Sequence, residues 1–364
     1  MDPISTANVI ANHSAGGGIP APVNVSAPSA IWQRAKERLN TVEELLHKRY
    51  FPSALIGRAA GYHLATGGKR FRPLMVLAVG ESLNCDPQIT QHLAVATELL
   101  HNASLVHDDL QDNDTFRRGR ETVWKRFGPE TAINLGDLFI TDTYLELTRI
   151  EVPDVNVGQL VSLFADSSRK VIAGQSAEME ASRRIEIGPK DYLRIAKGKS
   201  GVLMALPVVS VLTALQADSE TITNARQAME WLGVSYQIQD DLADIYGHNK
   251  GRPAGVDLRE GRCNLPVIFF YESASATDQK AFEAFVTASE PSGADQVGYW
   301  VDRIQKSEAV KRCRASVEMA DQIASRHLEN LTHSLLRETL KAGRDILLST
   351  ASRQNRGSNA ILSN

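Results

Sequence analysis

The sequence has few cysteines, few aromatic residues and no basic excess, and each shortage excludes a class of protein. Its three cysteines, Cys85, Cys263 and Cys313, match no metal or redox spacing, so we interpret them as reduced thiols of a cytoplasmic protein. A net charge of −3 argues against nucleic-acid binding. No apolar run reaches the length of a membrane span, so we expect a chain that does not cross a membrane.

Helical periodicity fills the middle of the chain, whereas both ends lack it. Residues 1–30 hold Pro, Gly, Ser, Ala and Asn, with no Lys or Arg; this predicts a disordered tail, not a secretory signal or transit peptide. After it a 3.6-residue stripe begins with Ala35 and Leu39. We find no sustained alternation and no hairpin turn signals, and aromatic residues are only 6%, low for a sheet protein. We therefore predict one all-α domain at 31–350 and a flexible tail at 351–364.

Two acidic motifs stand out. In the first, Asp108 and Asp112 are i,i+4 neighbours about 5–6 Å apart on one helix face. Such carboxylates repel each other, and a divalent cation such as Mg²⁺ removes the penalty. One such motif alone is more often a solvated acidic helix end than a metal site. A second motif at 240–244, Asp-Asp-Leu-Ala-Asp, also follows an apolar helix, and the pair favours a metal site.

Basic segments accompany both motifs. Residues 69–72 carry three cations at a helix start, which suits an anion, although a generic basic cap is an equal alternative. A basic turn at 117–120 follows the first motif. The segment 197–201 has phosphate-binding composition without the spacing of a P-loop. The loop at 251–262 again mixes cations with glycine.

Three residues upstream of the first motif each allow a structural and a functional interpretation. His101 lies two turns before Asp108 on nearly the same face, where a histidine is more often a core polar group than a ligand. Ala103 and Ser104 are small for a helix among leucines. They permit either close helix packing or an open channel beside the acidic motif.

Taken together, these motifs resemble the trans-isoprenyl diphosphate synthase (polyprenyl synthetase) family. GGKRFRP, HDDLQDND with RRGR, the Lys199-Ser200 pair, YQIQDDLADI and GRPAGVDLREGRCNLP occur in the order of that family between Trp32 and Arg344. The resemblance implies a single large antiparallel helix bundle around a deep central cavity. It also implies a homodimer that binds isopentenyl diphosphate and an allylic diphosphate.

The resemblance assigns roles to individual residues. The residues that it implies for a cluster of three Mg²⁺ ions are Asp108, Asp112 and Asp240, supported directly or through water by Asp109, Asp241 and Asp244. The residues that it implies for the diphosphate of isopentenyl diphosphate are Lys69, Arg72, His101 and Arg118. For the allylic diphosphate it implies Arg117, Lys199 and Arg252, and for the lining of the reacting carbons it implies Ser200 and Gln237. We predict that Lys199, Ser200 and Gln237 are catalytic.

The loop at 251–262 and the residues directly after it, here called the late loop, depart from the family pattern. Arg252 and Arg262, both predicted to bind substrate, stand where lysine is usual, and Asn264 stands where threonine is usual. Charge is kept, but a guanidinium fork and an ammonium are not interchangeable. We expect turnover to be retained, with its rate open to change.

The predicted activity is a Mg²⁺-dependent condensation of isopentenyl diphosphate with an allylic diphosphate. The chain shows no Ser-His or Cys-His dyad, which agrees with the family's use of released pyrophosphate as base. The alternatives are a farnesyl or longer-chain synthase, a class I terpene cyclase, which usually lacks a second DDxxD motif, and a non-catalytic synthase subunit.

Product length is predicted from small residues near the first motif. At about 1.5 Å per residue, Ala103 lies roughly 7 Å deeper than Asp108. Ala103 and Ser104 are too small to stop a chain of ten or fifteen carbons there, so Leu99, Leu100 or a neighbouring helix would form the floor. The Gly174-Gln175 pair and the segments around the first motif look most like bacterial geranylgeranyl diphosphate synthases, which predicts a twenty-carbon product.

Overall fold

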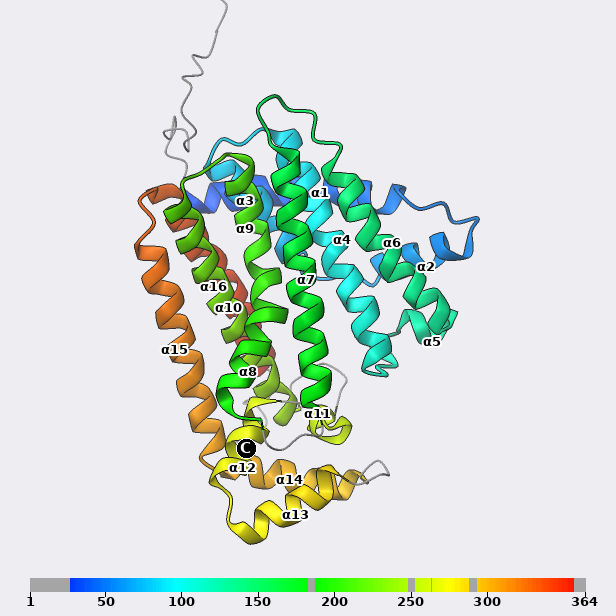
Figure 1. Cartoon of the computed structure of the whole chain (residues 1–364), viewed down its shortest axis with the longest axis vertical. Coiled ribbons are helices and arrows are strands. Elements are labelled where there is room, and N and C mark those ends of the chain that lie inside the picture. Colours follow the sequence, from blue (N-terminus) through cyan, green and yellow to red (C-terminus); the bar gives the residue numbers. More distant parts are fainter. Residues whose placement is uncertain (1–26, 183–186, 248–252, 263, 288–292, 357–364) are drawn as a thin grey trace, which may run out of the picture.

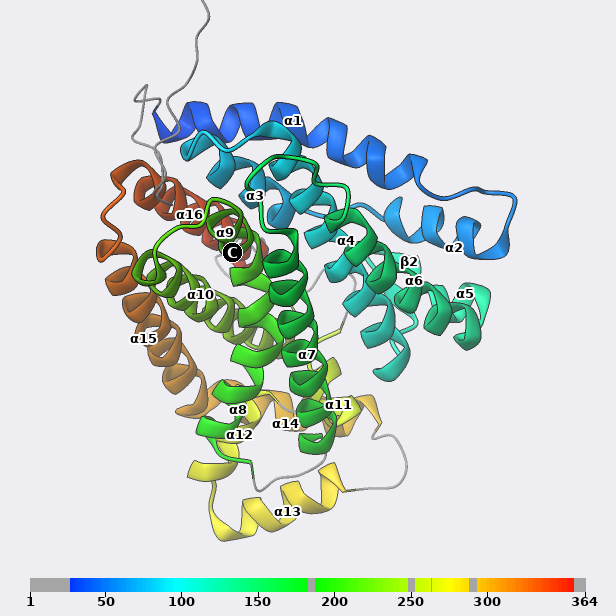
Figure 2. The ribbon, with the colours of Figure 1, turned by 45° about the horizontal axis from the view of Figure 1, so that its top comes forward.

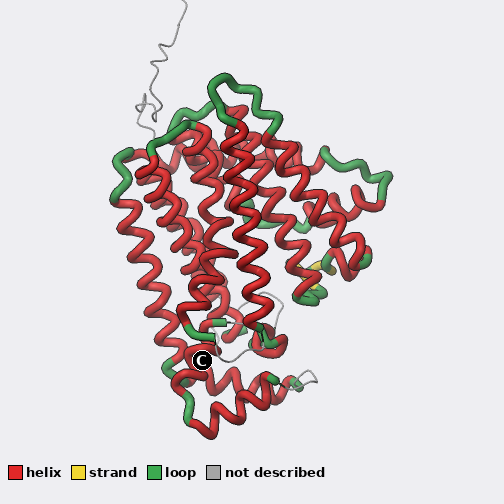
Figure 3. Tube along the Cα trace, in the orientation of Figure 1, coloured by secondary structure: helices red, strands yellow, loops and turns green. Residues whose placement is uncertain are grey.

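The computed structural model describes residues 27–182, 187–247, 253–262, 264–287 and 293–356, and nearly all of them are helical (Figure 3). This confirms the predicted all-α class. The first helix begins at Pro28 and the last continues to Arg356, so both helices pass slightly beyond the predicted boundaries. Most of the predicted N-terminal tail, together with Arg252 and Cys263, lies outside the described residues.

In the described ranges, the elements follow one another as a series of helices with one short hairpin. The elements of the first half are α1 (Pro28–Lys48), α2 (Leu55–Leu64), α3 (Phe71–Ser82), α4 (Pro87–Gln111), β1 (Phe116–Arg117), β2 (Arg120–Glu121), α5 (Val123–Phe127), α6 (Pro129–Leu147) and α7 (Val157–Ala181). The elements of the second half are α8 (Pro189–Ala196), the π-helical turn η1 (Lys197–Gly201), α9 (Val202–Ala214), α10 (Ser219–Ile245), α11 (Val256–Glu260), α12 (Leu265–Ser273), α13 (Ala276–Val286), α14 (Ala294–Lys306), α15 (Ala309–Glu329) and α16 (Ser334–Arg356).

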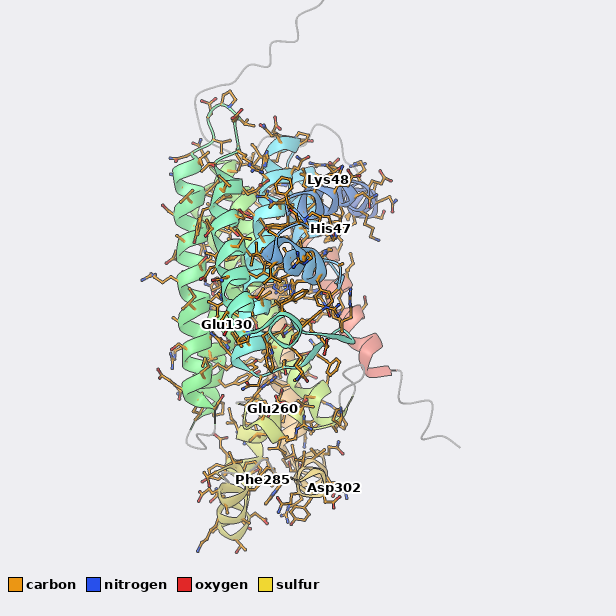
Figure 4. The ribbon with its side chains drawn as sticks, turned by 90° about the vertical axis from the view of Figure 1, so that its right-hand side faces the viewer. His47, Lys48, Glu130, Glu260, Phe285 and Asp302 are labelled. Atoms are coloured by element: carbon orange, nitrogen blue, oxygen red, sulfur yellow. The ribbon has the colours of Figure 1, made fainter. Side chains whose placement is uncertain are left out.

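The long helices form a bundle whose lower end carries both acidic motifs. In Figure 1, α4, α7 and α10 run from the upper end to the lower end, while α6, α15 and the path from α8 to α9 run upward. Helix α1 crosses the upper end (Figure 2). The pair α13 and α14 lies below the bundle. Figure 4 places Glu260 of α11 between the bundle and that pair, which carries Phe285 and Asp302.

The hairpin was not predicted, and its size explains why. Strands β1 and β2 pair antiparallel over two residues each, too few for an alternating pattern to show in the sequence. The turn between them is Arg118-Gly119, with φ of 53° and 78°. These left-handed conformations favour a tight two-residue hairpin turn. The hairpin therefore holds the two arginines 117 and 118 just after the first acidic motif.

The core is built from two clusters of buried apolar side chains that meet along α10. The larger joins α1, α3, α4, α6, α7, α9 and α16, and the smaller joins α12–α15 to the lower half of α10. In the described part of the chain one helical stretch, Pro189–Ala214, is long and apolar enough to cross a membrane. However, 78% of the apolar 18-residue segment within this stretch is buried inside the protein, as in a core helix.

A π-helical turn joins α8 to α9, and it was also missed by sequence reasoning. The turn is η1, and glycines pack against it from both sides. A Cβ on Gly174 of α7 would lie 2.9 Å from the backbone nitrogen of Lys199, and one on Gly233 of α10 would lie 2.7 Å from Cα of Gly201. Such π-turns are frequent at functional sites, and this one carries Lys199 and Ser200.

Candidate active site

The first acidic motif ends helix α4 with two half-buried carboxylates. Asp108 and Asp112 lie one turn apart, and their side chains are 17% and 25% exposed. Burial raises the pKa of Asp108 to about 6, although nearby Lys199 opposes the shift. Burial likewise raises the pKa of Asp112. Both ionised carboxylates are thus poorly solvated, and each would gain from a bound cation.

Asp109, between them, is held by a protein partner. Nη2 and Nε of Arg117 lie 2.6 and 2.7 Å from its Oδ1. Burial alone would lower the pKa of Arg117, but its hydrogen bond and ion pair with Asp109 raise it overall. This pair ties the β1–β2 hairpin to the end of α4. Asp109 therefore positions Arg117 beside the site, and its role as a metal ligand stays a prediction.

The second motif divides in the same way between exposed and buried carboxylates. Asp240 is exposed. Asp241 is buried and accepts hydrogen bonds from the Tyr192 hydroxyl at 2.7 Å and the Leu265 backbone N–H at 3.0 Å. Asp244 accepts one from the backbone N–H of Asp257 at 3.2 Å.

Burial is the main cause of the shifted pKa values in this motif. It raises the pKa of Asp241 to about 7 and that of Asp244 to about 8, and in both cases the Asp257 carboxylate adds to the shift. Asp241 is therefore built into the protein, whereas Asp240 is the member most open to solvent.

The three predicted catalytic residues lie together beside the first motif. The Lys199 ammonium is 2.5 Å from a carboxylate oxygen of Glu178 and 3.6 Å from Oδ2 of Asp108. Ser200 Oγ donates to Oε1 of Gln237 at 2.7 Å, and Nε2 of Gln237 donates to Oδ1 of Asp241 at 3.0 Å. A hydrogen-bond path thus links the π-turn to the second motif.

Two residues of this region were missed as site residues. Glu178 is one turn beyond Gly174 on α7, and Tyr192 is on α8; both line a small depression together with Lys199, Ser200 and Gln237. Neither belongs to a local motif. Their partners lie 21 and 49 positions away in the sequence, so only the packing of α7 and α8 reveals them.

The predicted cations for isopentenyl diphosphate also converge. Nη1 of Arg72 lies 3.0 Å from Nε2 of His101. Burial, with Arg72 nearby, keeps the pKa of His101 well below its usual value, so a neutral ring accepts this hydrogen bond. The Arg118 guanidinium lies over the backbone of Gly68, where a Cβ would be 2.8 Å from its Nη1. Lys69 follows Gly68 in the sequence, and its ammonium nitrogen lies 6.0 Å from the centre of the Tyr236 ring.

One cation of the same segment has a structural role. Arg70 is buried, binds Glu43, lies 2.8 Å from a carboxylate oxygen of Glu98 and donates to the Leu64 carbonyl oxygen. Of the three cations at 69–72, it is therefore the one that holds α1, α3 and α4 together.

Arg262 also binds carboxylates of the protein. Its guanidinium lies 2.7 Å from Asp114, 3.3 Å from Asp257 and 2.5 Å from Glu260. Asp112 is within 4.0 Å. Arg262 thus ties the late loop to the end of α4, and its predicted contact with substrate stays a prediction.

A largely apolar cavity of about 290 Å³ opens beside Asp108 and reaches up between α4, α6, α7 and α9. Ala103 and Ser104 line it one turn above the acidic motif, and Leu100 lines it one turn further up. Leu99, the other residue predicted for the floor, is fully buried and is not part of this wall. The remaining wall residues are His107, Gln111, Ile140, Ser168, Val171, Ile172, Gln175, Ser176, Met179 and Leu203.

The protein alone does not complete a metal site. In the ranges that the structure describes, no group of three or more His, Cys, Asp or Glu side chains could hold an ion. Magnesium is usually held by one or two carboxylates together with substrate phosphates and water. The exposed Asp240 and the poorly solvated pair Asp108 and Asp112 fit such partial ligation.

Comparison with known proteins completes the description of the site. The sequence profile of the family described as "Polyprenyl synthetase" matches residues 53–304, which include both acidic motifs. A geranylgeranyl pyrophosphate synthase of Geoglobus acetivorans is 37% identical over 244 residues, covering 66% of this chain and 76% of that protein. Heptaprenyl diphosphate synthase component 2 of Geobacillus stearothermophilus is 27% identical over 312 residues, covering 84% and 91%. The structure of a geranylgeranyl pyrophosphate synthetase from Pyrococcus horikoshii matches with a TM-score of 0.77 at 27% identity, covering 88% and 98%.

Proposed function

Since the chain belongs to the polyprenyl synthetase family and is therefore an isoprenyl diphosphate synthase, we propose that it condenses isopentenyl diphosphate with an allylic diphosphate to a twenty-carbon trans product. The observation that carries the proposal is the apolar cavity that starts at Asp108 and passes Ala103 and Ser104. It joins a place for a charged head group to a place for a hydrocarbon tail.

Three Mg²⁺ ions are proposed to bind between the two motifs. Asp108 and Asp112 on α4 and Asp240 on α10 would hold them, with Asp244 in support. Such ions, when bound, stabilise the departing diphosphate as Lewis acids. The buried Asp109 and Asp241 would keep the two helix ends in place through their bonds to Arg117 and Tyr192.

The remaining polar residues would orient the two substrates. Lys199 is held beside Asp108 and would contact the allylic diphosphate, while Ser200 and Gln237 would face the carbons that carry the positive charge. Arg72 and Arg118 would hold the diphosphate of isopentenyl diphosphate. The C1–O bond of the allylic diphosphate would break, with both electrons leaving on the diphosphate. The double bond of isopentenyl diphosphate would then form the new bond to C1, and the isopentenyl unit would lose a proton to the released diphosphate.

The size of the tail site supports a product of intermediate length. Small side chains at 103 and 104 leave the cavity open, and larger ones, Leu100, Ile140 and Leu203, also line its walls. The relatives carry names of both geranylgeranyl and heptaprenyl synthases, so product length has to be measured. A heptaprenyl-length product is the second candidate.

Chromatography of the products tests the function directly. The purified chain, with Mg²⁺ and isopentenyl diphosphate, is supplied in turn with dimethylallyl, geranyl or farnesyl diphosphate. We expect geranylgeranyl diphosphate from each primer and none when Mg²⁺ is chelated. Longer products would replace the twenty-carbon assignment, and cyclised hydrocarbons would indicate a terpene cyclase. No turnover with any primer would favour the non-catalytic subunit.

Ala103→Phe tests the path of the tail. The ring would fill the cavity one turn above Asp108, so the main product should shorten to fifteen carbons or fewer. Ala281→Phe, which adds the same ring at an exposed position of α13 away from the cavity, is the control and should keep the wild-type product. If Ala103→Phe makes the wild-type product at an undiminished rate, the tail takes another path.

We further propose a cytoplasmic homodimer. Large apolar side chains are exposed on α6 and α7, namely Ile133, Leu145, Ile172 and Met179. Pairing of two copies over these helices would cover them. Light scattering after size exclusion should give twice the chain mass of 39.8 kDa, and a monomer would contradict this part of the proposal.

A further inference from the structure

The cavity wall contains one polar group whose hydrogen-bonding capacity is unused. Gln175 on α7 is only 7% exposed, yet neither the oxygen nor the nitrogen of its carboxamide has a hydrogen-bond partner in the part of the chain that the structure describes. A buried amide without partners costs free energy and is rare in native proteins. A ligand that enters the cavity is one way to satisfy it, because Gln175 forms part of the cavity wall.

The position of Gln175 on α7 is fixed by its neighbours. The preceding residue, Gly174, packs against the backbone of Lys199, and Glu178, one turn later, binds the Lys199 ammonium at 2.5 Å. Gln175 therefore lies on a helix anchored to the π-turn on both sides. Gln175 shares the cavity with Asp108. Its neighbour Gly174 contacts the turn whose Lys199 ammonium lies 3.6 Å from Oδ2 of Asp108, which places Gln175 near the end where the allylic carbons would meet the diphosphate.

We propose that Gln175 is a further catalytic residue whose carboxamide oxygen stabilises the allylic cation. The inference rests on the proposed function. When the C1–O bond breaks, both electrons leave with the diphosphate, and the positive charge is shared by C1 and C3. The isopentenyl double bond then supplies the electrons of the new bond at C1, and a proton passes to the released diphosphate. Gln175 forms no bond and takes no proton.

An amide is chemically suited to this position. In an apolar, water-poor cavity a fixed dipole acts more strongly than it does in water. A carboxylate there would be a better nucleophile and could trap the cation as an ester, whereas a neutral amide oxygen is a weak one. The unused oxygen of Gln175 thus gives charge stabilisation without a competing covalent reaction.

The test compares Gln175→Leu with Gln159→Leu, which makes the same change at an exposed position of the same helix. Both are assayed with Mg²⁺, isopentenyl diphosphate and geranyl diphosphate. We expect kcat of Gln175→Leu to fall roughly 10- to 100-fold, as for the loss of one preorganised polar group, with both KM values nearly unchanged. Gln159→Leu should behave as the wild type.

A fluorinated primer separates a direct role from a structural one. Fluorine at the C3 methyl of geranyl diphosphate withdraws electrons, so the transition state carries a more fully developed charge. If Gln175 stabilises that charge, the loss in Gln175→Leu with the fluorinated primer should exceed the product of the two separate losses. Simple multiplication of the two losses would overturn the proposal, as would a wild-type kcat in Gln175→Leu.

A bound water molecule is the remaining alternative, and it has its own signature. Without isopentenyl diphosphate, water captures the cation and releases geraniol. If Gln175→Leu lowers only this geraniol release while prenyl transfer stays at the wild-type rate, the amide holds water and our assignment is wrong. Failure of the wild type to join the two diphosphates would instead refute the proposed function.

Discussion

Alanine at Gly174 or Gly233 should disturb both the stability and the activity of the enzyme, because these glycines enclose the π-turn. A Cβ on Gly174 would lie 2.9 Å from the Lys199 backbone nitrogen and 3.1 Å from the carbonyl carbon of Gly198. A Cβ on Gly233 would lie 2.7 Å from Cα of Gly201. In both cases the new methyl group would clash with backbone atoms, which cannot rotate away as a long side chain could. Either the turn or the helix that carries the new methyl group has to move.

The expected magnitude is a balance of two effects. Alanine in a helix interior is more favourable than glycine by about 0.5–1 kcal/mol. Overpacking a tight contact costs about 1–3 kcal/mol, and a clash with backbone belongs at the upper end of that range. We therefore expect each variant to lose about 1–2 kcal/mol of unfolding free energy.

The loss of activity should be larger in proportion, because the turn carries Lys199 and Ser200. A displacement of about 1 Å in a catalytic group can cost about 100-fold in rate. A shift of a few tenths of an ångström in this turn should therefore lower kcat by about tenfold. The Ser200–Gln237 hydrogen bond of 2.7 Å would lengthen at the same time.

Denaturant unfolding followed by circular dichroism gives the stability, and initial rates give kcat. Gly61→Ala is the matched control, since a Cβ there would meet nothing within 4 Å in the interior of α2. It should gain about 0.5–1 kcal/mol and keep the wild-type rate. If Gly174→Ala and Gly233→Ala gain stability as Gly61→Ala does and keep full activity, the turn is not clamped as we describe.

Asp108→Asn should lower turnover by orders of magnitude with an unchanged helical spectrum, and a near wild-type rate at saturating Mg²⁺ would refute its metal role. Arg72→Ala and Arg118→Ala should mainly raise KM for isopentenyl diphosphate; a raised KM for the primer alone would mean that the two diphosphate sites are exchanged. Burial lowers the pKa of His63 to about 3 from 6.5, so its neutral form is the one that the fold accepts. The contribution of the neutral His63 side chain to the free energy of unfolding is complete above about pH 6.5. It falls by about 1.4 kcal/mol for each pH unit below that value. His63→Gln should lose this slope in unfolding titrations between about pH 7 and pH 5, and an equal slope in both proteins would contradict the burial of a neutral imidazole.

Helix content and the acidic motifs could be predicted from the sequence because both are local patterns. Residues i and i+4 share a helix face whatever the helix packs against, so the pairing of Asp108 with Asp112 followed directly. The assignment of both motifs to one cluster of metal ions came only from the resemblance, because nothing local places the end of α10 near the end of α4. In the structure the two helices end at the same side of the bundle (Figure 1).

Features that depend on distant partners could not be predicted. The π-turn owes its tight packing to Gly174 and Gly233, which lie on two other helices. Glu178 has no motif of its own and is identified by its contact with Lys199. The β1–β2 hairpin is too short for periodicity, although the Arg-Gly pair at its turn was visible in the sequence.

The arginines show most clearly what the structure adds, because the sequence gives no means of sorting them. Burial by itself lowers the pKa of a guanidinium, and carboxylate partners outweigh that effect in Arg70, Arg117 and Arg262, whose pKa values are raised. In Arg72 and Arg118 burial prevails and the pKa values are lowered, since no carboxylate in the described part of the chain lies within ion-pair distance of either. The first three arginines are already neutralised by the protein. Of the other two, Arg72 is partly buried and Arg118 is exposed; the charge of each is still to be matched, and a diphosphate anion would match it. This difference in charge supports the placement of isopentenyl diphosphate that the resemblance implies for Arg72 and Arg118, and it separates them from Arg70, which has a structural role.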